Sequence, residues 1–475
     1  MKVKYLLILL IVTFSIKINA QFSTLVNADG PNFFFPNATP ISDGTHLYVV
    51  TAYDGLHGDG TIFKILPDGT GYSRIFDFDD AISGKNPSGS LFFDGTFLYG
   101  MTNGGGINSM GVIFKIKPDG TMFSKLFDFD GTNGGYPYSG HLISDGTYLY
   151  GMTSYGGMNY GGLLFKIKTD GTGFTHVLDF SDTLSGKIPF GSLFYDGTFL
   201  YGMTEQGGSN NGGNGTIFKI QPDGTNYSRI FNFSGLLTGG APEGSLISDG
   251  MFLYGMTKYG GANDDGAIFK IMPDGTSFSV LYNFLDSTSG SYPRGSLVYD
   301  GTFLYGVTLG GGGYFYDGTI FKILPDGNGY SVLHGFTGTP NGGSPSASLF
   351  YDGTFFYGTT SEGGAPWSNG TVFKFKENPS SVTESVTESN FNVYPNPSVD
   401  GNITLTFNMP NEGNIDVHIF TTEGKLIYSN SIFCRANSHN ELPVGLNEIS
   451  TNTGMYILEA STSDAVFRKK IIVMR

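Results

Sequence analysis

The chain has 475 residues, of which 73 are Gly, 42 are Phe and 28 are Tyr, and charged residues make up only 14%. A net charge of −15 argues against a nucleic-acid partner, because an acidic chain repels phosphate backbones. The abundance of aromatic residues argues against disorder, and the high Gly content indicates many short strands joined by tight turns.

Residues 1–20, MKVKYLLILLIVTFSIKINA, predict a signal peptide. Lys2 and Lys4 form a basic start, an apolar stretch follows, and Ala20 offers a small residue for cleavage. No other segment approaches the about 18 apolar residues of a membrane-spanning helix. We therefore expect an exported protein with no transmembrane segment in its mature form. Its single cysteine, Cys434, permits no intrachain disulfide and is expected to be a buried apolar residue.

Internal repetition is the dominant feature of the sequence from residue 21 to residue 377. An Asp-Gly pair, a Phe-Lys pair and a Pro-Asp-Gly or Thr-Asp-Gly turn recur in that order about every 51 residues, the two pairs seven times and the turn six times. The Asp-Gly pairs begin at Asp43, Asp94, Asp145, Asp196, Asp249, Asp300 and Asp352.

Each repeat predicts four β-strands. In residues 89–129, four runs rich in aromatic and β-branched residues are separated by an Asp-Gly turn, a Gly-rich loop and a Pro-Asp-Gly turn. In the copy FYDGTFLYGMT at residues 194–204, we expect Asp196 to turn the chain, Tyr201 to pack, and Gly202 to let a neighbouring blade approach.

The last repeat ends after its third strand, whereas Phe22-Ser23 near the mature N-terminus matches the fourth strand of the other repeats. A strand from the N-terminus would complete the last blade and remove the open edges of the array. An open solenoid would instead need end caps, and none is visible. The sequence thus predicts an all-β fold, a seven-bladed β-propeller over residues 21–377 that is closed by its N-terminal strand.

Strand alternation divides the connections of each blade between two faces. The constant Asp-Gly and Pro-Asp-Gly turns share one face, whereas the variable second connections and the links between blades share the other, the variable face. Variable loops on a rigid scaffold commonly bind ligands, and exposed aromatic residues suit sugar rings or protein patches. The alternative for each tyrosine is packing within its own loop. The ligand-binding candidates on the variable face are Tyr53, Tyr155, Tyr259, Tyr314, Tyr316, Trp367 and Glu205.

No group of residues carries a clear catalytic signature. The repeated Asp and Lys residues occupy seven equivalent positions each, so we expect structural roles, with each Lys amine meeting a carboxylate or solvent. Non-repeating acids on the variable face can form the carboxylate pair, about 5–10 Å apart, that a glycosidase needs. His and Arg are scarce there, however, and we name no catalytic residue, no metal site and no cofactor.

The repeat pattern ends after Glu377. Residues 378–390 form a polar linker without aromatic residues. Residues 391–475 contain evenly spaced alternating runs, which predict a small Ig-like β-sandwich.

Four segments of this C-terminal part, VYPNPSVDG, TTEGKLIY, TNTGMYILEA and RKKIIVMR, resemble the type A sorting domain of the type IX secretion system of Bacteroidota. The resemblance implies recognition by the type IX translocon and export through the inner and outer membranes to the cell surface or the extracellular space. The residues that carry the resemblance include Tyr394, Pro395, Asn396, Pro397, Gly424, Gly454 and Tyr456.

The repeat itself, DGTFLYGMTxxGG followed by GxIFKIxPDGT, resembles the GloVer tandem-repeat family, a Gloeo/Verruco-type, choice-of-anchor family. That resemblance implies no general activity. Three functions stay open on the sequence alone. The first is a surface or extracellular scaffold that binds a glycan or an extracellular protein, the second is a polysaccharide-active hydrolase or lyase, and the third is a structural surface protein without a discrete ligand.

Overall fold

The structure is a computed structural model that describes residues 20–27, 35–138, 140–208, 213–312, 317–364, 369–377, 391–395, 398, 402–408, 413–421, 426–435, 439–445, 454–461 and 466–473. The chain divides into two compact units, Met1–Glu377 and Asn378–Arg475, each described here by itself. The predicted signal peptide lies outside the described residues except for Ala20. Among the described residues, no helix is long and apolar enough to cross a membrane.

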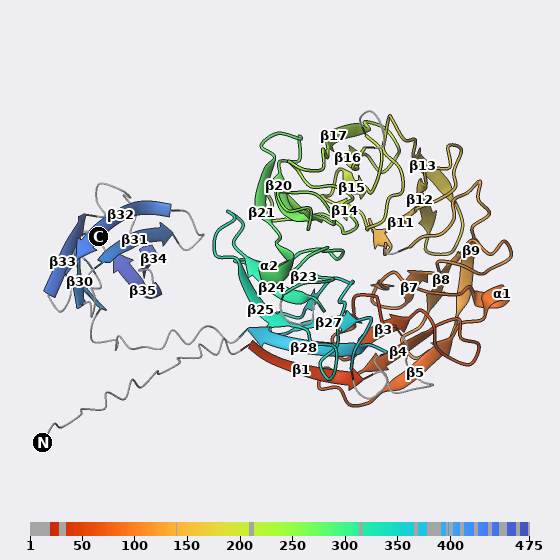
Figure 1. Cartoon of the computed structure of the whole chain (residues 1–475), viewed down its shortest axis with the longest axis horizontal. Helices are drawn as coiled ribbons and strands as arrows, with labels where there is room; N and C mark the ends of the chain where they lie inside the picture. Colours follow the sequence, from red (N-terminus) through yellow and green to blue (C-terminus); the bar gives the residue numbers. More distant parts are fainter. Residues whose placement is uncertain are drawn as a thin grey trace, which may run out of the picture. The chain divides into compact units, whose positions relative to one another are not determined.

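The described part of the first unit folds into seven four-stranded antiparallel sheets, which follow one another around a central axis in a propeller-like arrangement (Figure 1). The first four sheets are β2 (Ile41–Ser42), β3 (Leu47–Thr51), β4 (Thr61–Ile65) and β5 (Ser73–Asp77); β6 (Phe92–Phe93), β7 (Leu98–Met101), β8 (Val112–Ile116) and β9 (Ser124–Asp128); β10 (Ile143–Ser144), β11 (Tyr148–Thr153), β12 (Leu163–Lys168) and β13 (Thr175–Asp179); and β14 (Phe194–Tyr195), β15 (Leu200–Thr204), β16 (Thr216–Ile220) and β17 (Ser228–Asn232).

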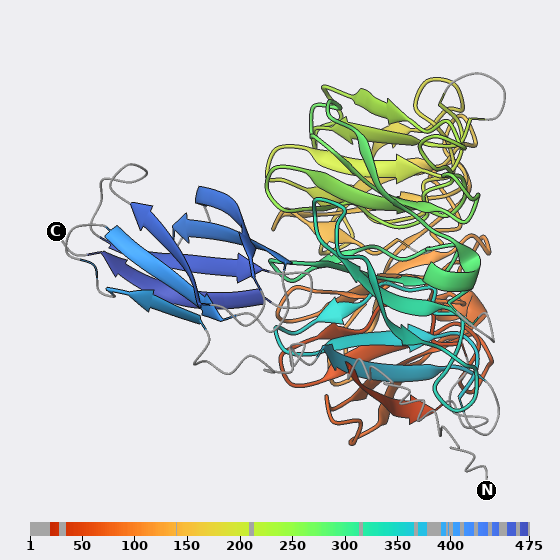
Figure 2. The same ribbon diagram turned by 60° about the vertical axis from the view of Figure 1, so that its left-hand side comes forward.

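Three further sheets complete the first unit. Two single-turn helices, α1 (Asp80–Ser83) and α2 (Asp286–Ser289), lie in the links between sheets, and Figure 2 shows α2 at the edge of the unit. The fifth sheet is β18 (Ile247–Ser248), β19 (Leu253–Thr257), β20 (Ala267–Ile271) and β21 (Ser279–Asn283); the sixth is β22 (Val298–Tyr299), β23 (Leu304–Thr308), β24 (Thr319–Ile323) and β25 (Ser331–Gly335); the seventh is β26 (Phe350–Tyr351), β27 (Phe356–Thr360), β28 (Thr371–Glu377) and β1 (Ala20–Asn27).

The seventh sheet takes its fourth strand from the N-terminus, as the sequence predicts. Strand β1 pairs antiparallel with β28 from Ala20 opposite Glu377 to Asn27 opposite Thr371. The Phe22 ring lies 3.9 Å from the His334 ring and 5.3 Å from the Phe373 ring, centroid to centroid. Phe174 occupies the same place in the third sheet, stacked 3.8 Å from Phe127 of β9. A displaced strand therefore performs the packing that the fourth strand performs elsewhere.

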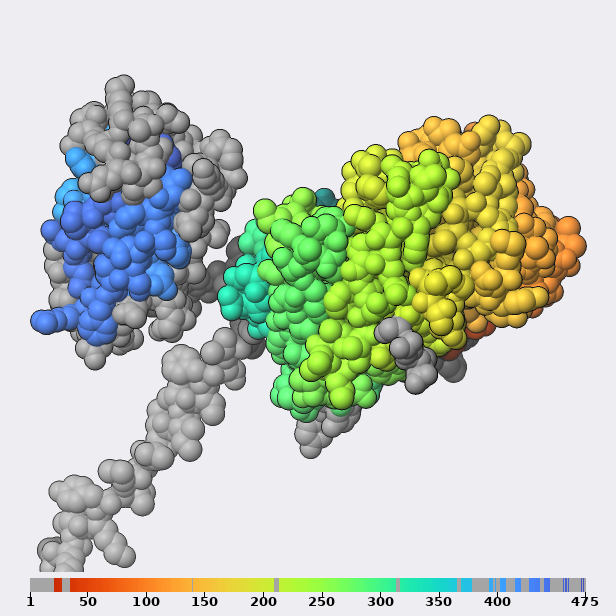
Figure 3. Space-filling view, turned by 90° about the horizontal axis from the view of Figure 1, so that it is seen from above, coloured from red at the N-terminus to blue at the C-terminus, as the bar shows by residue number. Residues whose placement is uncertain are grey.

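The hydrophobic core of the first unit lies between consecutive sheets. Each of its seven core clusters takes residues from two neighbouring sheets, and one of them joins the seventh sheet to the first through Tyr357, Val372, Leu47 and Val49. The second strands β15 and β19, both LYGMT, are buried along their whole length. In Figure 3 neighbouring sheets form one continuous outer wall on the side in view.

The Asp-Gly turn is a hydrogen-bonded hairpin, as predicted. One oxygen of the Asp196 carboxylate accepts the backbone N–H groups of Thr198 and Phe199, and the other accepts the Tyr201 hydroxyl at 2.9 Å. The expectation for Gly202 was wrong. A Cβ at Gly202 would lie 2.4 Å from the ring of Phe218, its partner in the same sheet, so this glycine makes room for that ring rather than for a neighbouring sheet.

The repeated lysines join neighbouring sheets through backbone carbonyls, which the sequence prediction of a carboxylate or solvent partner missed. In six sheets the Lys amine donates to a backbone carbonyl in the third turn of the next sheet, which is the Pro-Asp-Gly or Thr-Asp-Gly turn between its third and fourth strands. One of these six is Lys374 of the seventh sheet, which reaches the Pro67 carbonyl of the first sheet at 3.2 Å. Lys322 faces the seventh sheet, whose third turn is missing because its fourth strand is displaced. The Glu377 carboxylate at the end of β28 accepts the Lys322 amine instead.

The second unit contains two sheets around one core. The first sheet consists of β29 (Phe391–Tyr394), β30 (Asn402–Asn408) and β33 (His439–Gly445), and the second of β32 (Leu426–Cys434), β31 (Gly413–Thr421), β34 (Gly454–Ser461) and β35 (Val466–Val473). Leu405 and Ile419, one from each sheet, are completely buried in the shared core. Cys434 is buried as predicted, and burial raises the pKa of its thiol.

Candidate functional site

The variable connections meet on one face of the first unit, as strand alternation predicts. Isolated β-bridges join a link between sheets to the second connection of the following sheet, for example Lys187 to Gln206, Gly240 to Tyr259 and Ser291 to Gly310. The two kinds of variable segment therefore hold each other in place where they reach the axis.

A ring of hydroxyl groups binds the innermost segments together. Four residues before each Asp-Gly pair, six of the seven repeats carry Ser or Thr and the third carries His141. In each of six steps the backbone N–H of one repeat donates to the side-chain oxygen of the next, and the step from Ser348 to Thr39 joins the last sheet to the first at 3.1 Å. The residue before these hydroxyls is small because the strands are close: a Cβ at Gly191 would lie 2.2 Å from the Gly244 carbonyl oxygen.

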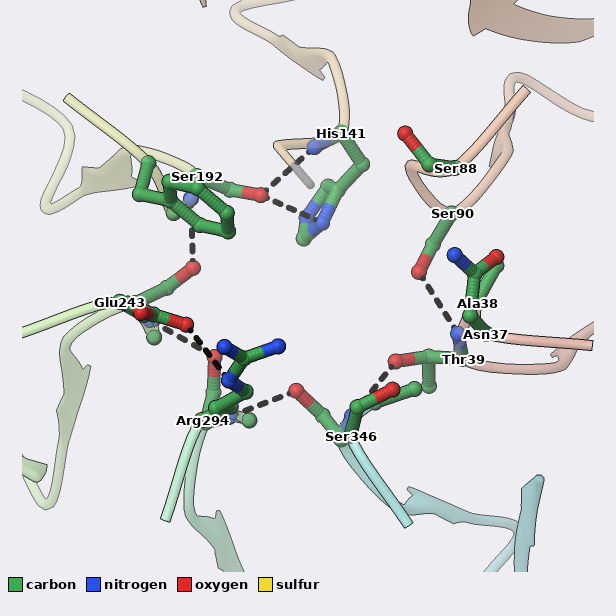
Figure 4. A pocket seen from close by; sticks show the side chains of 18 of the residues that line it. Asn37, Ala38, Thr39, Ser88, Ser90, His141, Ser192, Glu243, Arg294 and Ser346 are labelled. Carbon is green, nitrogen blue, oxygen red and sulfur yellow. Dashed lines mark hydrogen bonds and ion pairs between the residues drawn. The ribbon is translucent and has the colours of Figure 1, made fainter. Parts of the chain in front are cut away.

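A cavity of about 660 Å³ lies on the axis inside this ring (Figure 4). Its shape comes from the position six residues before each Asp-Gly pair, where the repeats differ in size and charge. Small polar residues occupy this position in the seventh, first and second sheets, and larger residues occupy it in the fourth, fifth and sixth. The described residues at this position are Asn37, Ser88, Phe190, Glu243, Arg294 and Ser346.

One wall of the cavity carries charge. The Glu243 side chain is only 3% exposed and lies between two cations, with the Lys258 amine 2.7 Å from one carboxylate oxygen and Arg294 Nε 3.1 Å from the other. The Arg294 side chain is 37% exposed. Its terminal nitrogens lie on the cavity side of the ion pair (Figure 4). The guanidinium is thus anchored through Nε and presents its outer edge to the cavity.

Glu205 joins this cluster from the end of β15. Burial raises the pKa of its carboxyl, and the Glu243 carboxylate raises that pKa further. Lys258 and Arg294 act in the opposite direction without cancelling the shift. The structure therefore brings one sequence candidate, Glu205, next to an acid and two cations that stand on separate repeats.

A neutral histidine lies next around the ring. Burial lowers the pKa of His141 to about 4, so the imidazole is uncharged at neutral pH. The Ser192 hydroxyl oxygen accepts the His141 backbone N–H at 2.7 Å and lies 2.7 Å from Nδ1. The Ser192 hydroxyl therefore ties both the backbone and the ring of His141 to the next repeat.

Aromatic and amide groups complete the lining. The rings of Tyr138 and Phe190, from neighbouring links, are nearly parallel, with centroids 5.6 Å apart. On the opposite side, the buried side-chain carbonyl oxygens of Asn37 and Asn103 have no hydrogen-bond partner. The cavity thus offers an aromatic surface and a guanidinium edge to one small ligand.

The sequence candidates fall in different places. Tyr53 is 55% exposed and lines the cavity, with its ring 5.9 Å from that of Phe35. Tyr155 and Tyr259 pack on tyrosines of their own surroundings, 6.0 Å from Tyr136 and 5.5 Å from Tyr292, and neither lines the cavity. The candidates Tyr314, Tyr316 and Trp367 lie outside the described residues.

Sequence reasoning missed His141, Phe190 and Arg294 as site residues. The available signal was the departure of each from the small or hydroxyl residue that most of the other copies carry at its repeat position. In the second unit, Tyr394 is exposed and its hydroxyl donates to Glu441 at 3.2 Å, whereas Tyr456 is buried. Pro395 and Gly454 are described in the backbone, and Asn396, Pro397 and Gly424 lie outside the described residues.

The repeats, the seven sheets and the two-sheet second unit define an all-β, propeller-like repeat protein with a separate C-terminal domain. The Gloeobacter/Verrucomicrobia repeat model matches residues 11–214 and 195–338, and the chain belongs to that family. The secretion system C-terminal sorting domain model matches residues 392–474. This domain marks proteins that type IX secretion exports to the cell surface or the extracellular space, so the chain is an exported protein.

No curated protein matches the chain. Among solved structures, PorZ of Porphyromonas gingivalis, a surface component of the type IX secretion system, is 13% identical over 95% of this chain, with a TM-score of 0.47. The chain spans 60% of the length of that protein. The tricorn protease is 13% identical over 92% of this chain and 44% of its own, with a TM-score of 0.38. A GH43B protein of the Bacteroides ovatus xyloglucan locus is 13% identical over 96% of this chain and 92% of its own, with a TM-score of 0.34.

Proposed function

We propose that the seven sheets are the blades of a seven-bladed β-propeller spanning residues 21–377, closed by β1. The pairing of β1 with β28, the core shared by the seventh and first sheets, and the Ser348–Thr39 and Lys374–Pro67 hydrogen bonds support this closure. Residues 391–475 form an Ig-like sandwich that engages the type IX translocon after residues 1–20 have directed export from the cytoplasm, and residues 378–390 link the two domains.

The exported propeller is a binding protein that holds a glycan, or a glycan-bearing extracellular partner, at the axial cavity of its variable face. The observation that carries this proposal is the concentration of non-repeating side chains in one cavity: six sheets contribute Asn37, Ser88, Phe190, Glu243, Arg294 and Ser346 at the same repeat position. Cavities of about 300–1,000 Å³ accommodate small ligands, and this one falls within that range. A purely structural surface protein would have no need of such differences.

The ion pairs made by the acidic residues of the cavity favour a binding function over glycan hydrolysis. A glycosidase needs one carboxyl that donates a proton and a second that is free to act on the sugar. Glu243 is held by Lys258 and Arg294, so its carboxylate is committed to two ion pairs. Glu205 would be left without a second free acid beside it.

A glycan array probed with the full exported chain tests the proposal. We expect binding that the Phe190→Ala variant loses, because this substitution removes half of the aromatic surface of the cavity. A matched control is Tyr160→Ala, which removes an aromatic ring that is 69% exposed on the same face but lies outside the cavity. Binding that both variants retain would contradict the axial site, and release of shortened products from a bound glycan would favour the hydrolase.

A further inference from the structure

We propose that the axial cavity selects an acidic sugar, a hexuronate unit whose carboxylate is held by the outer edge of the Arg294 guanidinium. This inference rests on the proposed glycan-binding function and narrows its ligand class. Three features carry it: the guanidinium of Arg294, the local balance of charge, and the adjoining aromatic surface.

The guanidinium is prepared for a second carboxylate. Glu243 forms its ion pair at Nε, 3.1 Å away, which leaves the two terminal nitrogens on the cavity side as a donor pair. Such a pair matches the two oxygens of a carboxylate, and each charge-assisted hydrogen bond is stronger than a bond between neutral groups. Because Lys258 also neutralises Glu243, a ligand carboxylate at Arg294 does not have to displace an internal partner.

The charge in the cavity contrasts with that of the whole protein. The chain carries a net charge of −15, but this wall holds two cations against the Glu243 carboxylate. Glu205 is the remaining acid of the cluster, and burial and Glu243 favour its neutral form. A small anion in the cavity therefore meets the Arg294 cation, whose nearest acid, Glu243, is shared with Lys258.

The remaining lining fits a sugar ring. Tyr138 and Phe190 present a nearly flat aromatic surface next to the charged wall, which suits the apolar face of a pyranose. The neutral imidazole of His141 lines the same cavity and adds a polar ring edge beside this surface.

Calorimetric titration of the full exported chain with matched sugar pairs tests the inference. We expect glucuronate and galacturonate to bind at least about tenfold more tightly than glucose and galactose, as the loss of charge-assisted hydrogen bonds implies. Arg294→Gln should remove the preference for the acid. Arg294→Lys should retain part of it, because the charge remains while the paired donors are lost. Glu205→Gln should strengthen uronate binding and leave glucose binding unchanged.

Lys187→Gln is the control, because Lys187 forms a 3.0 Å ion pair with Asp182 on the same face but outside the cavity. The melting temperature of each variant shows that it is folded. Equal affinity for acidic and neutral sugars, or a uronate preference that survives both Arg294 substitutions, would overturn the inference and leave the proposed function standing. Absence of binding to these sugars, with array binding to other glycans, would also overturn it. Absence of binding on the array as well would remove the proposed function itself.

Discussion

Replacing Phe22 by Ala tests whether an N-terminal strand carries the seventh sheet. The Phe22 ring stacks between His334 and Phe373 and contacts the edge of Phe336. Truncating a fully buried Phe costs about 3–5 kcal/mol, so a half-buried ring should cost about 2 kcal/mol. At about 2 °C per kcal/mol for a domain of this size, the melting temperature should fall by about 4 °C.

The matched variant is Phe174→Ala in the third sheet, whose ring makes the equivalent contacts to Phe127, Phe129 and Phe165. Calorimetric melting of the full exported chain should show similar losses for the two variants, and deletion of residues 21–30 should lower the melting temperature much further. An unchanged melting temperature for Phe22→Ala, beside a clear loss for Phe174→Ala, would refute ring closure by β1. The comparison is informative because a terminal strand that only lies on the surface would be dispensable.

Three further predictions concern ionised groups. Glu377→Gln should lower the free energy of unfolding by about 1–3 kcal/mol in urea denaturation, because it breaks a largely buried pair, and a double-mutant cycle with Lys322→Met should isolate the coupling. Glu205→Gln should raise the melting temperature at pH 7, where the charged form of Glu205 opposes folding. The pKa of Glu205 in the folded protein lies above its ordinary value of 4.5, so this gain in melting temperature should vanish as the pH falls below 4.5. The free energy of unfolding should also fall as the pH drops below 3.8, because several turn carboxyls have lowered pKa values in the fold and become protonated. In each of them burial acts to raise the pKa, but hydrogen bonds outweigh this effect. A free energy of unfolding that stays constant from pH 5 to pH 2 would contradict the prediction. These carboxyls are Asp43, Asp94, Asp145, Asp196 and Asp249.

Much of the fold could be predicted because the information is repeated. Seven copies of one turn and strand pattern reveal the period, and the incomplete last copy indicates where Phe22 must pack. The lysine contacts were not predictable from the same evidence. A Lys amine that donates to a backbone carbonyl has no sequence signature. Only the structure shows that the Glu377 carboxylate accepts the Lys322 amine in place of the missing turn carbonyl.

The candidate site was harder to predict, because its residues are far apart in the sequence. Tyr53 and Glu205 were identified by their loops, but Tyr155 and Tyr259 have the same sequence context and pack against other tyrosines. Loop composition alone cannot distinguish a ring that faces the axis from one that packs sideways. Arg294 was visible as a rare cation in a link, yet its importance depends on Glu243, which stands one repeat earlier.

A ring of repeats concentrates function on its axis for a geometric reason. The position six residues before each Asp-Gly pair recurs about every 51 residues, and closure places all described copies around one cavity. A substitution at this position changes the cavity without disturbing the hydroxyl ring two residues later, since the neighbouring hydrogen bonds use the backbone N–H and the side chain of a different residue. Phe190, Glu243 and Arg294 therefore differ from their copies at a position where the scaffold tolerates difference. A variable repeat position that faces the axis, rather than the motif that is repeated most faithfully, is where the ligand specificity of such a protein should be sought.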